Sequence, residues 1–336
     1  METKYISKSG LNEWFSQIVK SGKRVFAPVK SREQVEFKKV EKLDEVASDY
    51  IQTTQSIKSA VFPRAEVLFS YEKENGATTV EDFNPDTVKE TVLWNIRPCD
   101  AAGFKPLTAI FNWDYKDVLY NTHLEKTTTV SFSCAKADKS CFCTSVNGGP
   151  GNTAGSDIQL TILPDGGAIV EILTAKGEAL AQLAGSALEA DKGEDKNNYL
   201  ADVPQQFDAA AIREKLATAF DSPVWKEQSE RCLGCGACAF VCPTCACFDI
   251  QEDAHGSKGR RIRCWDACGM KLFTLHTSGH NPRSVQSQRW RQRILHKFSY
   301  MPDRLNVVGC TGCGRCSRAC PVDMNILEHL TSIAKK

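Results

Sequence analysis

Two stretches of the chain share one spacing: Cys232-Leu-Gly-Cys235-Gly-Ala-Cys238-Ala-Phe-Val-Cys242-Pro243 and Cys310-Thr-Gly-Cys313-Gly-Arg-Cys316-Ser-Arg-Ala-Cys320-Pro321. Both follow C-x2-C-x2-C-x3-C-P, the spacing with which ferredoxins hold 4Fe-4S clusters. The glycines beside the cysteines allow positive φ angles, so that backbone amides can approach the cluster sulfides. The repeat therefore predicts two 4Fe-4S clusters.

The fourth cysteine of each copy is expected to bind the other cluster, as it does in two-cluster ferredoxins. One cluster then takes Cys232, Cys235, Cys238 and Cys320, and the other takes Cys310, Cys313, Cys316 and Cys242. The alternatives are a zinc site and a redox dithiol. Zinc ribbons use pairs of C-x2-C rather than two four-cysteine runs that end in proline, so the clusters are favoured.

Eight further cysteines form two groups of four, the number that a cubane requires. One group lies in the N-terminal half and comprises Cys99, Cys134, Cys141 and Cys143. The other lies between the two motifs and comprises Cys245, Cys247, Cys264 and Cys268. We treat each group as a candidate for one more iron–sulfur or other metal centre. Buried thiols beside a cluster and a zinc ion are the alternatives.

The bulk composition is that of a globular protein with 336 residues, 25% charged residues and a net charge of +1. No apolar run approaches the roughly 18–20 residues of a membrane helix, so no membrane insertion is expected. The first residues alternate in charge and lack an apolar leader, which favours the cytoplasm. Disulfides are rare there, so sixteen cysteines point to metal binding.

Positive charge is concentrated in the cysteine-rich part: from residue 231 onward there are 16 Lys and Arg against 7 Asp and Glu. Arg289, Arg291, Arg293 and Lys297 surround Trp290, a composition that could bind nucleic acid. A cubane with four thiolates carries about two negative charges, so basic residues are also needed beside clusters. We favour that role and expect no nucleic acid. No G-x-G-x-x-G or Walker A motif is present, and no catalytic residue is predicted.

The predicted fold class is α+β, with a mixed α/β domain over 1–205 and a helical dicluster ferredoxin domain over 206–336. Helical spacing covers 11–19, with Ser9 as N-cap and a stop at Gly22. Strands are predicted at 24–29, 65–71, 91–96 and 128–132, and a hairpin joins 158–163 to 168–173. Helices are expected at 207–220 and 325–334. The 67 residues between the motifs favour an α-helical rather than a β-type ferredoxin.

An ordered set of short motifs resembles a known family. It comprises Arg24-Val-Phe-Ala-Pro28, Arg97-Pro-Cys-Asp100, Cys134 with Cys141-Phe-Cys143, the Cys-Pro-Thr-Cys-Ala-Cys run that ends at Cys247, Trp265-Asp-Ala-Cys268, Gly279-His-Asn-Pro-Arg283, and Arg293 with His296-Lys297. The set resembles the iron–sulfur β subunits of cytoplasmic sulfhydrogenases and the corresponding iron–sulfur component of anaerobic sulfite reductase. The likeness runs from about residue 23 to 320.

The resemblance implies an accessory electron-transfer subunit of an oxidoreductase complex rather than a catalyst. A flavin subunit that oxidises NAD(P)H would supply electrons, and a terminal reductase or hydrogenase subunit would receive them. It supports metal-binding roles for the extra cysteines other than Cys264, whose place before the tryptophan is usually not a cysteine. The alternative is a self-contained reductase that binds substrate at an incompletely ligated cluster.

Overall fold

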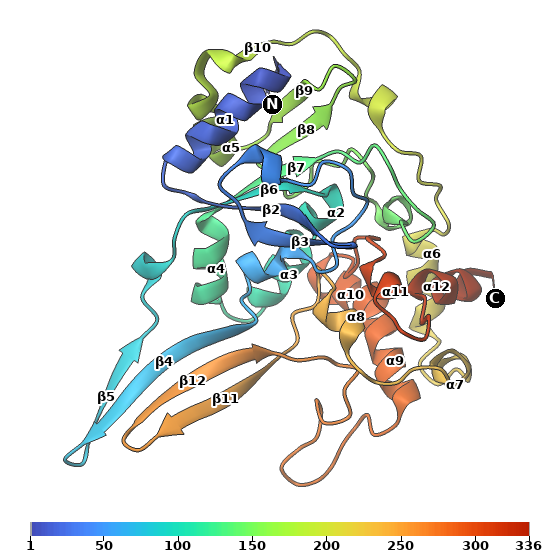
Figure 1. Cartoon of the computed structure of the whole chain (residues 1–336). Coiled ribbons are helices and arrows are strands. Elements are labelled where there is room, and N and C mark those ends of the chain that lie inside the picture. The colour runs from blue at the N-terminus through green and yellow to red at the C-terminus, as the bar shows by residue number, and fades with distance from the viewer. Residues whose placement is uncertain (1, 336) are drawn as a thin grey trace.

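The computed structural model describes residues 2–335 and contains two sheets and a set of short helices (Figure 1). The larger sheet has eight strands in the order β10-β1-β9-β8-β7-β6-β2-β3. Its strands are β1 (Glu2–Ile6), β2 (Arg24–Ser31), β3 (Gln34–Lys39), β6 (Thr91–Ile96), β7 (Thr127–Phe132), β8 (Ile158–Ile162), β9 (Ala168–Ile172) and β10 (Leu188–Ala190). The central strands β2, β6, β7 and β8 are parallel, and the outer pairs are antiparallel.

Strand β6, an inner strand of the large sheet, is buried on both faces. Every residue of β6 is buried, as expected for a parallel strand that reads as a continuous apolar run. Trp94 on β6 meets Trp14 and Phe15 of helix α1 (Lys8–Lys20) in edge-to-face contacts with ring centroids 5.2 and 5.3 Å apart. The four predicted strands and the 158–173 hairpin are confirmed, with Ile162 opposite Ala168.

Helix α1 begins one turn earlier than predicted. Ser7, not Ser9, is its N-cap, because β1 ends at Ile6 and the Ser7 hydroxyl accepts a hydrogen bond from the Gly10 amide at 3.1 Å. The predicted stop is confirmed: Gly22 has a φ of +82° and its amide donates to the Val19 carbonyl.

The second sheet combines strands from both halves of the sequence. Its order is β11-β12-β4-β5, with β4 (Ala65–Glu74), β5 (Ala77–Asp82), β11 (Phe248–His255) and β12 (Lys258–Trp265), and it projects as an arm (Figure 1). The segment between the cysteine motifs is therefore not wholly helical as expected. Residues 248–265 form a hairpin there because Gly256, with φ +61°, closes a turn and β4 offers a pairing edge. The domain boundary at 205 stays a prediction.

The helices lie in two groups. Those around the large sheet are α2 (Pro98–Ala101), α3 (Phe104–Phe111), α4 (Val118–Glu125) and α5 (Ala175–Ala181). Those of the cysteine-rich part are α6 (Ala209–Ala217), α7 (Val224–Ser229), α8 (Ala237–Phe240), α9 (Gln286–Leu295), α10 (Met301–Leu305), α11 (Arg315–Arg318) and α12 (Ile326–Lys335), with a π turn at His296–Tyr300. The helices predicted at 207–220 and 325–334 correspond to α6 and α12. Within residues 2–335 no helix has the length and apolarity to cross a membrane.

Buried His329 on α12 makes the stability of this helical core dependent on pH. Its ring lies edge-on to Trp290 at 4.9 Å, and burial lowers its pKa to about 4. An unfolded histidine has a pKa of about 6.5, so the unfolded chain takes up the proton first as the pH falls. Stability should be constant above pH 6.5 and fall between 6.5 and about 4. Between pH 7 and pH 5 this one group contributes a loss of about 2 kcal/mol.

The measurement is urea unfolding followed by tryptophan fluorescence under anaerobic conditions at pH 7 and pH 5. The variant His329→Phe keeps a ring against Trp290 and should show the smaller loss of stability on acidification. An equal loss in the variant and the parent would mean that His329 is not the group responsible.

Candidate iron–sulfur centres

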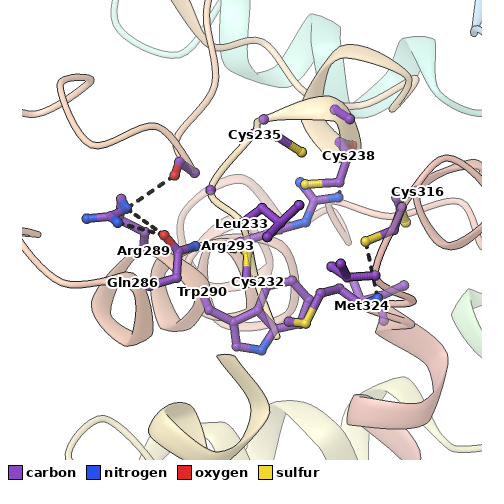
Figure 2. A pocket seen from close by; sticks show the side chains of 17 residues that line it. Cys232, Leu233, Cys235, Cys238, Gln286, Arg289, Trp290, Arg293, Cys316 and Met324 are labelled. Atoms are coloured by element: carbon purple, nitrogen blue, oxygen red, sulfur yellow. Dashed lines mark hydrogen bonds between the residues drawn. The ribbon is translucent and has the colours of Figure 1, made fainter. Parts of the chain in front are cut away.

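The first cysteine motif and the last cysteine of the second motif line one cavity. Cys232, Cys235 and Cys238 line it (Figure 2). Cys320 also lines it, and so does Cys316, which the sequence assigns to the other cluster. The turn between these cysteines requires glycine, because Gly236 has a φ of +75° and a Cβ there would lie 2.8 Å from the Ala267 Cβ. The cysteines predicted for one cluster, three local and one crossed over, thus share one cavity.

A second cavity holds the other predicted set. It is lined by Cys242, Cys310, Cys313 and Cys316, so the cysteine contributed by the first motif again crosses to the second. Gly312, with φ +65°, sits so close to the N-terminal half that an added Cβ would lie 2.5 Å from the Cys143 backbone. The Phe142 amide donates to the Gly312 carbonyl at 2.9 Å. This turn therefore joins the second motif to the N-terminal cysteine group.

The N-terminal group forms a third cavity, which we call the N-terminal quartet site. Cys99, Cys134, Cys141 and Cys143 all line it, beside Gly312 and Cys313. Its position follows from the sheet: Cys99 lies in α2 directly after β6, and Cys134 lies two residues after β7. The two strands are parallel neighbours, so their carboxyl ends bring both cysteines to the same edge.

Nitrogen donors approach a sulfur in each of the three cavities. The contacts are Gln286 Nε2 to Cys232 at 3.0 Å, the Met324 amide to Cys320 at 3.2 Å, the Gly312 amide to Cys310 at 3.4 Å, Gln52 Nε2 to Cys99 at 3.2 Å, and Arg318 Nη2 to Cys141 at 3.3 Å. Such hydrogen bonds stabilise negative charge on sulfur and set the potentials of iron–sulfur clusters. The residues around these cavities therefore fit a group, such as an iron–sulfur cluster, that cysteine thiolates bind.

Burial also shifts the acidity of several of these cysteines. Burial raises the pKa of Cys310 to about 12, and that of Cys313, Cys134 and Cys143 to about 11. A buried thiolate without compensation is unfavourable, whereas iron or another metal cation stabilises it directly. These thiols cannot supply that cation for one another, so they would become thiolates only with iron or another metal cation beside them.

The fourth group is only partly assembled. A hydrogen bond from Cys268 lowers the pKa of Cys247, and Cys245 is hydrogen-bonded to Cys242 of the second cavity. Cys264 lies within β12 between Arg263 and Trp265, which are both buried on the opposite face of that strand. Among residues 2–335, neither in this group nor in the other three do three Cys, His, Asp or Glu side chains gather at the spacing of a single metal ion. A role for the whole quartet stays a prediction.

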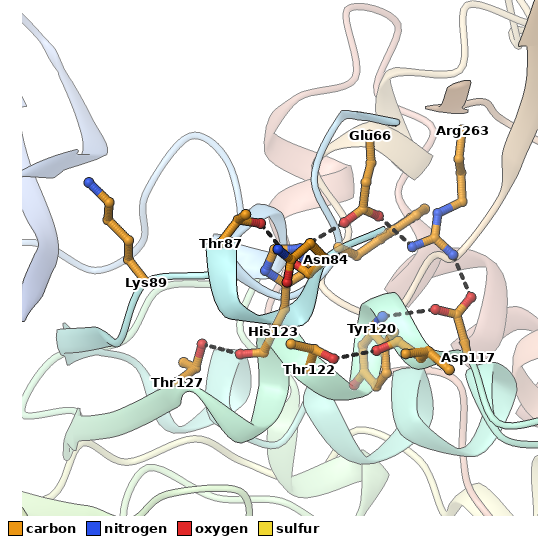
Figure 3. Close-up of polar contacts among 12 residues, drawn as sticks. Glu66, Asn84, Thr87, Lys89, Asp117, Tyr120, Thr122, His123, Thr127 and Arg263 are labelled. Atoms are coloured by element: carbon orange, nitrogen blue, oxygen red, sulfur yellow. Dashed lines mark hydrogen bonds and ion pairs between the residues drawn. The ribbon is translucent and has the colours of Figure 1, made fainter. Parts of the chain in front are cut away.

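A buried polar network fixes the arm that carries Cys264. Arg263 is 2% exposed and donates to Glu66 at 2.6 Å and to Asp117 at 2.5 Å (Figure 3). His123 contacts the other oxygen of Glu66 at 2.7 Å, and Asp117 caps helix α4 through the Tyr120 amide. Strands β4 and β12 are thereby tied to α4, which packs beside the large sheet.

Two cations of the basic run on α9 and the turn after it are directed inward. Arg293 approaches Cys245 Sγ at 3.6 Å, and Lys297 approaches Cys242 Sγ at 3.4 Å and donates to the Gly309 carbonyl at 2.6 Å. Burial alone would lower the pKa of Lys297, but the Cys242 and Cys245 sulfurs outweigh it and raise that pKa above its ordinary value. The Arg289 guanidinium donates hydrogen bonds to three backbone carbonyls at 2.9–3.2 Å. The predicted role beside clusters fits these contacts.

Sequence reasoning missed the ion pair that connects the two halves. Arg315 and Asp100 are each 1% exposed at their side chains and form two hydrogen bonds of 2.7 and 2.6 Å. Arg315 also donates to the Thr53 carbonyl at 3.0 Å. Asp100 ends the quoted motif Arg97-Pro-Cys-Asp100 and Arg315 lies inside Cys313-Gly-Arg-Cys316, but no local pattern pairs the two residues.

Comparison with known proteins agrees with this geometry. Residues 231–324 match the family described as a 4Fe-4S dicluster domain. The whole chain is 30% identical over 329 residues to the sulfhydrogenase 2 subunit beta of Pyrococcus furiosus, which covers 96% of this chain and 95% of that protein. No solved structure matches. The chain therefore belongs to the family of sulfhydrogenase β subunits and carries a 4Fe-4S dicluster domain in its C-terminal part.

Proposed function

We propose that the chain is an iron–sulfur electron-transfer subunit that relays electrons through at least three centres. The arrangement of the three cysteine-lined cavities carries this proposal. The N-terminal quartet site and the second cavity share Cys313, and the second and first cavities share Cys316 and Arg293. Neighbouring sites with common walls form a continuous row. When bound, each cluster would supply reversible one-electron chemistry, Fe(III) to Fe(II).

The proposed ligands follow from the cavities. The first would hold a 4Fe-4S cluster through Cys232, Cys235, Cys238 and Cys320, and the second through Cys310, Cys313, Cys316 and Cys242. The N-terminal quartet site would hold a third through Cys99, Cys134, Cys141 and Cys143. The chain's own residues donate hydrogen bonds to sulfur in these sites and place Arg293 and Lys297 as counter-charges.

The proposed partners are a flavin-containing subunit that oxidises NAD(P)H and a terminal reductase or hydrogenase subunit. Support comes from the relative, whose name describes it as one subunit of a sulfhydrogenase. A partner at each end of the row would allow electrons to enter at one site and leave at another. A chain of this kind needs no catalytic residue of its own.

Iron analysis of anaerobically purified protein tests the proposal, together with EPR of the dithionite-reduced sample. Three cubanes require about twelve irons per chain. Fewer than about eight would contradict even the two ferredoxin-type clusters. The reduced chain alone should not turn over sulfite or protons. Turnover without partners would favour the alternative of a self-contained reductase, with substrate near Cys245, Cys247 and Cys268.

Lys297 should set the potential of the centre in the second cavity. Its ammonium lies 3.4 Å from Cys242 Sγ, and loss of this charge makes an added electron less favourable. Lys297→Met should therefore lower that midpoint potential by about 50–100 mV. The measurement is an EPR-monitored redox titration. Lys271→Met, at an exposed position, is the matched control and should leave every midpoint unchanged; an equal shift in both variants would contradict a local role for Lys297.

A further inference from the structure

A cavity of about 750 Å³ opens at the carboxyl ends of β6 and β7 and contains none of the sixteen cysteines. Its walls are these strand ends, the 43–50 loop and the first turns of α1. The volume lies in the range of small-molecule sites, about 300–1,000 Å³. In open α/β sheets ligands bind outside the carboxyl ends of the parallel strands. Both the size and the place of the cavity are those of a ligand site.

The wall of this cavity is fixed by an unusual backbone position. Asn95 has a φ of +56°, and the pairing of β6 with β7 shifts register between Trp94 and Ile96. The turned-out Asn95 donates through Nδ2 to the Ala47 carbonyl at 3.0 Å and accepts a hydrogen bond from the Tyr50 hydroxyl. Left-handed non-glycine residues cluster at functional sites. Here the conformation holds the 43–50 loop in place over the strand ends.

The lining combines aromatic rings with cations. Phe132, Tyr50 and Tyr199 contribute rings, and Lys8 contributes an exposed ammonium group. Lys136 also lines the cavity but is paired with Asp49 at 2.8 Å, and Asp44 is a second acidic residue of the wall. The first turn of α1 contains no acidic residue, so its positive end is uncompensated there. Rings favour a planar apolar ligand, and Lys8 together with the positive end of α1 favours an anionic group on it.

The cavity lies directly against the N-terminal quartet site. Ser133, Ala135 and Lys136 line the cavity, whereas Cys134, between the first two, lines the quartet site. Lys136 and Arg97 line both. A single stretch of chain therefore separates the two. A redox-active ligand in the cavity would be close enough to the quartet site to exchange electrons with a centre there.

We propose that this cavity binds a planar aromatic molecule that carries a phosphate, in the size class of flavin mononucleotide. The binding itself stands on the cavity; a role for the ligand in exchanging electrons with the quartet site rests on the proposed function.

The test is a titration of the full-length, anaerobically purified protein with flavin mononucleotide, followed by quenching of flavin fluorescence. Saturable binding to one site per chain is expected, and riboflavin, which lacks the phosphate, should bind at least about tenfold more weakly. Val46→Trp fills the cavity from the loop and should weaken binding at least about tenfold. Ser48→Trp, at an exposed position of the same loop, tests the same point if the first variant does not fold.

Val80→Trp is the matched control, because Val80 is exposed on the distant arm, and it should bind flavin mononucleotide as the parent does. Iron content and EPR signals are recorded on every sample. Absence of saturable binding, or binding unchanged by both loop substitutions, would overturn the proposal even if the iron signals are intact. If the anaerobically purified protein contains no iron but still binds flavin mononucleotide, the result would support the cavity while counting against the proposed function.

Discussion

Arg315→Leu should destabilise the protein by about 3–5 kcal/mol, the range for removal of one partner of a buried ion pair. Asp100 would keep a carboxylate that is 1% exposed and has lost its counter-charge. The Thr53 carbonyl would lose its guanidinium donor as well. Because Asp100 follows β6 and Arg315 lies inside the second motif, the loss should separate the N-terminal sheet from the cysteine-rich part. Anaerobic urea unfolding measures it.

Two control variants test whether the loss of stability comes from the buried, unpaired charge of Asp100 or simply from the removal of an arginine. Arg213→Leu removes an arginine of α6 whose pair with Asp303 is exposed, with side chains at 50% and 46%, so a loss of at most about 1 kcal/mol is expected. The double variant Arg315→Leu with Asp100→Leu should be less destabilised than Arg315→Leu alone, because no unpaired charge remains. Equal losses in the single and double variants would show that the pair acts through packing rather than charge.

Local patterns predicted the elements well where they depend on nearby residues. The glycines beside the cysteines were expected to allow positive φ angles, and Gly234 and Gly312 both have a positive φ. The strand at β6 followed from its apolar run, and the hairpin from its Pro-Asp-Gly-Gly turn. The N-cap was misplaced because Ser7 and Ser9 are equally suitable alone, and only the end of β1 at Ile6 decides between them.

What the sequence could not predict depends on contacts between distant segments. Strand β11 is exposed at all eight residues, so it has no alternation of buried and exposed side chains to reveal it. Its partner β12 pairs with β4 across almost two hundred residues, as Cys264 opposite Ala65 illustrates. The cavity beside Asn95 likewise requires a loop, a helix and two strand ends to meet. No single stretch of sequence contains that information.

The crossed ligation makes the sharpest prediction for the clusters. Cys320→Ser removes a sulfur from the cavity that contains Cys232, although Cys320 belongs to the other motif. We therefore expect Cys320→Ser and Cys232→Ser to lose the same EPR signal, with up to about four irons per chain. Cys242→Ser and Cys310→Ser should together lose a different one. Serine is close in size to cysteine but is a much poorer ligand for iron.

Pairing of signals, rather than the amount of iron lost, decides between crossed and uncrossed ligation. If each motif bound its own cluster, Cys320→Ser would match Cys310→Ser and Cys242→Ser would match Cys232→Ser. That result would contradict the assignment even if every variant lost iron. Crossing also has a structural consequence, since each cluster would then bind both motifs across the 67 residues that separate them. Loss of either cluster should therefore loosen the contact between α8 and α11, the two helices that carry the third cysteine of each motif.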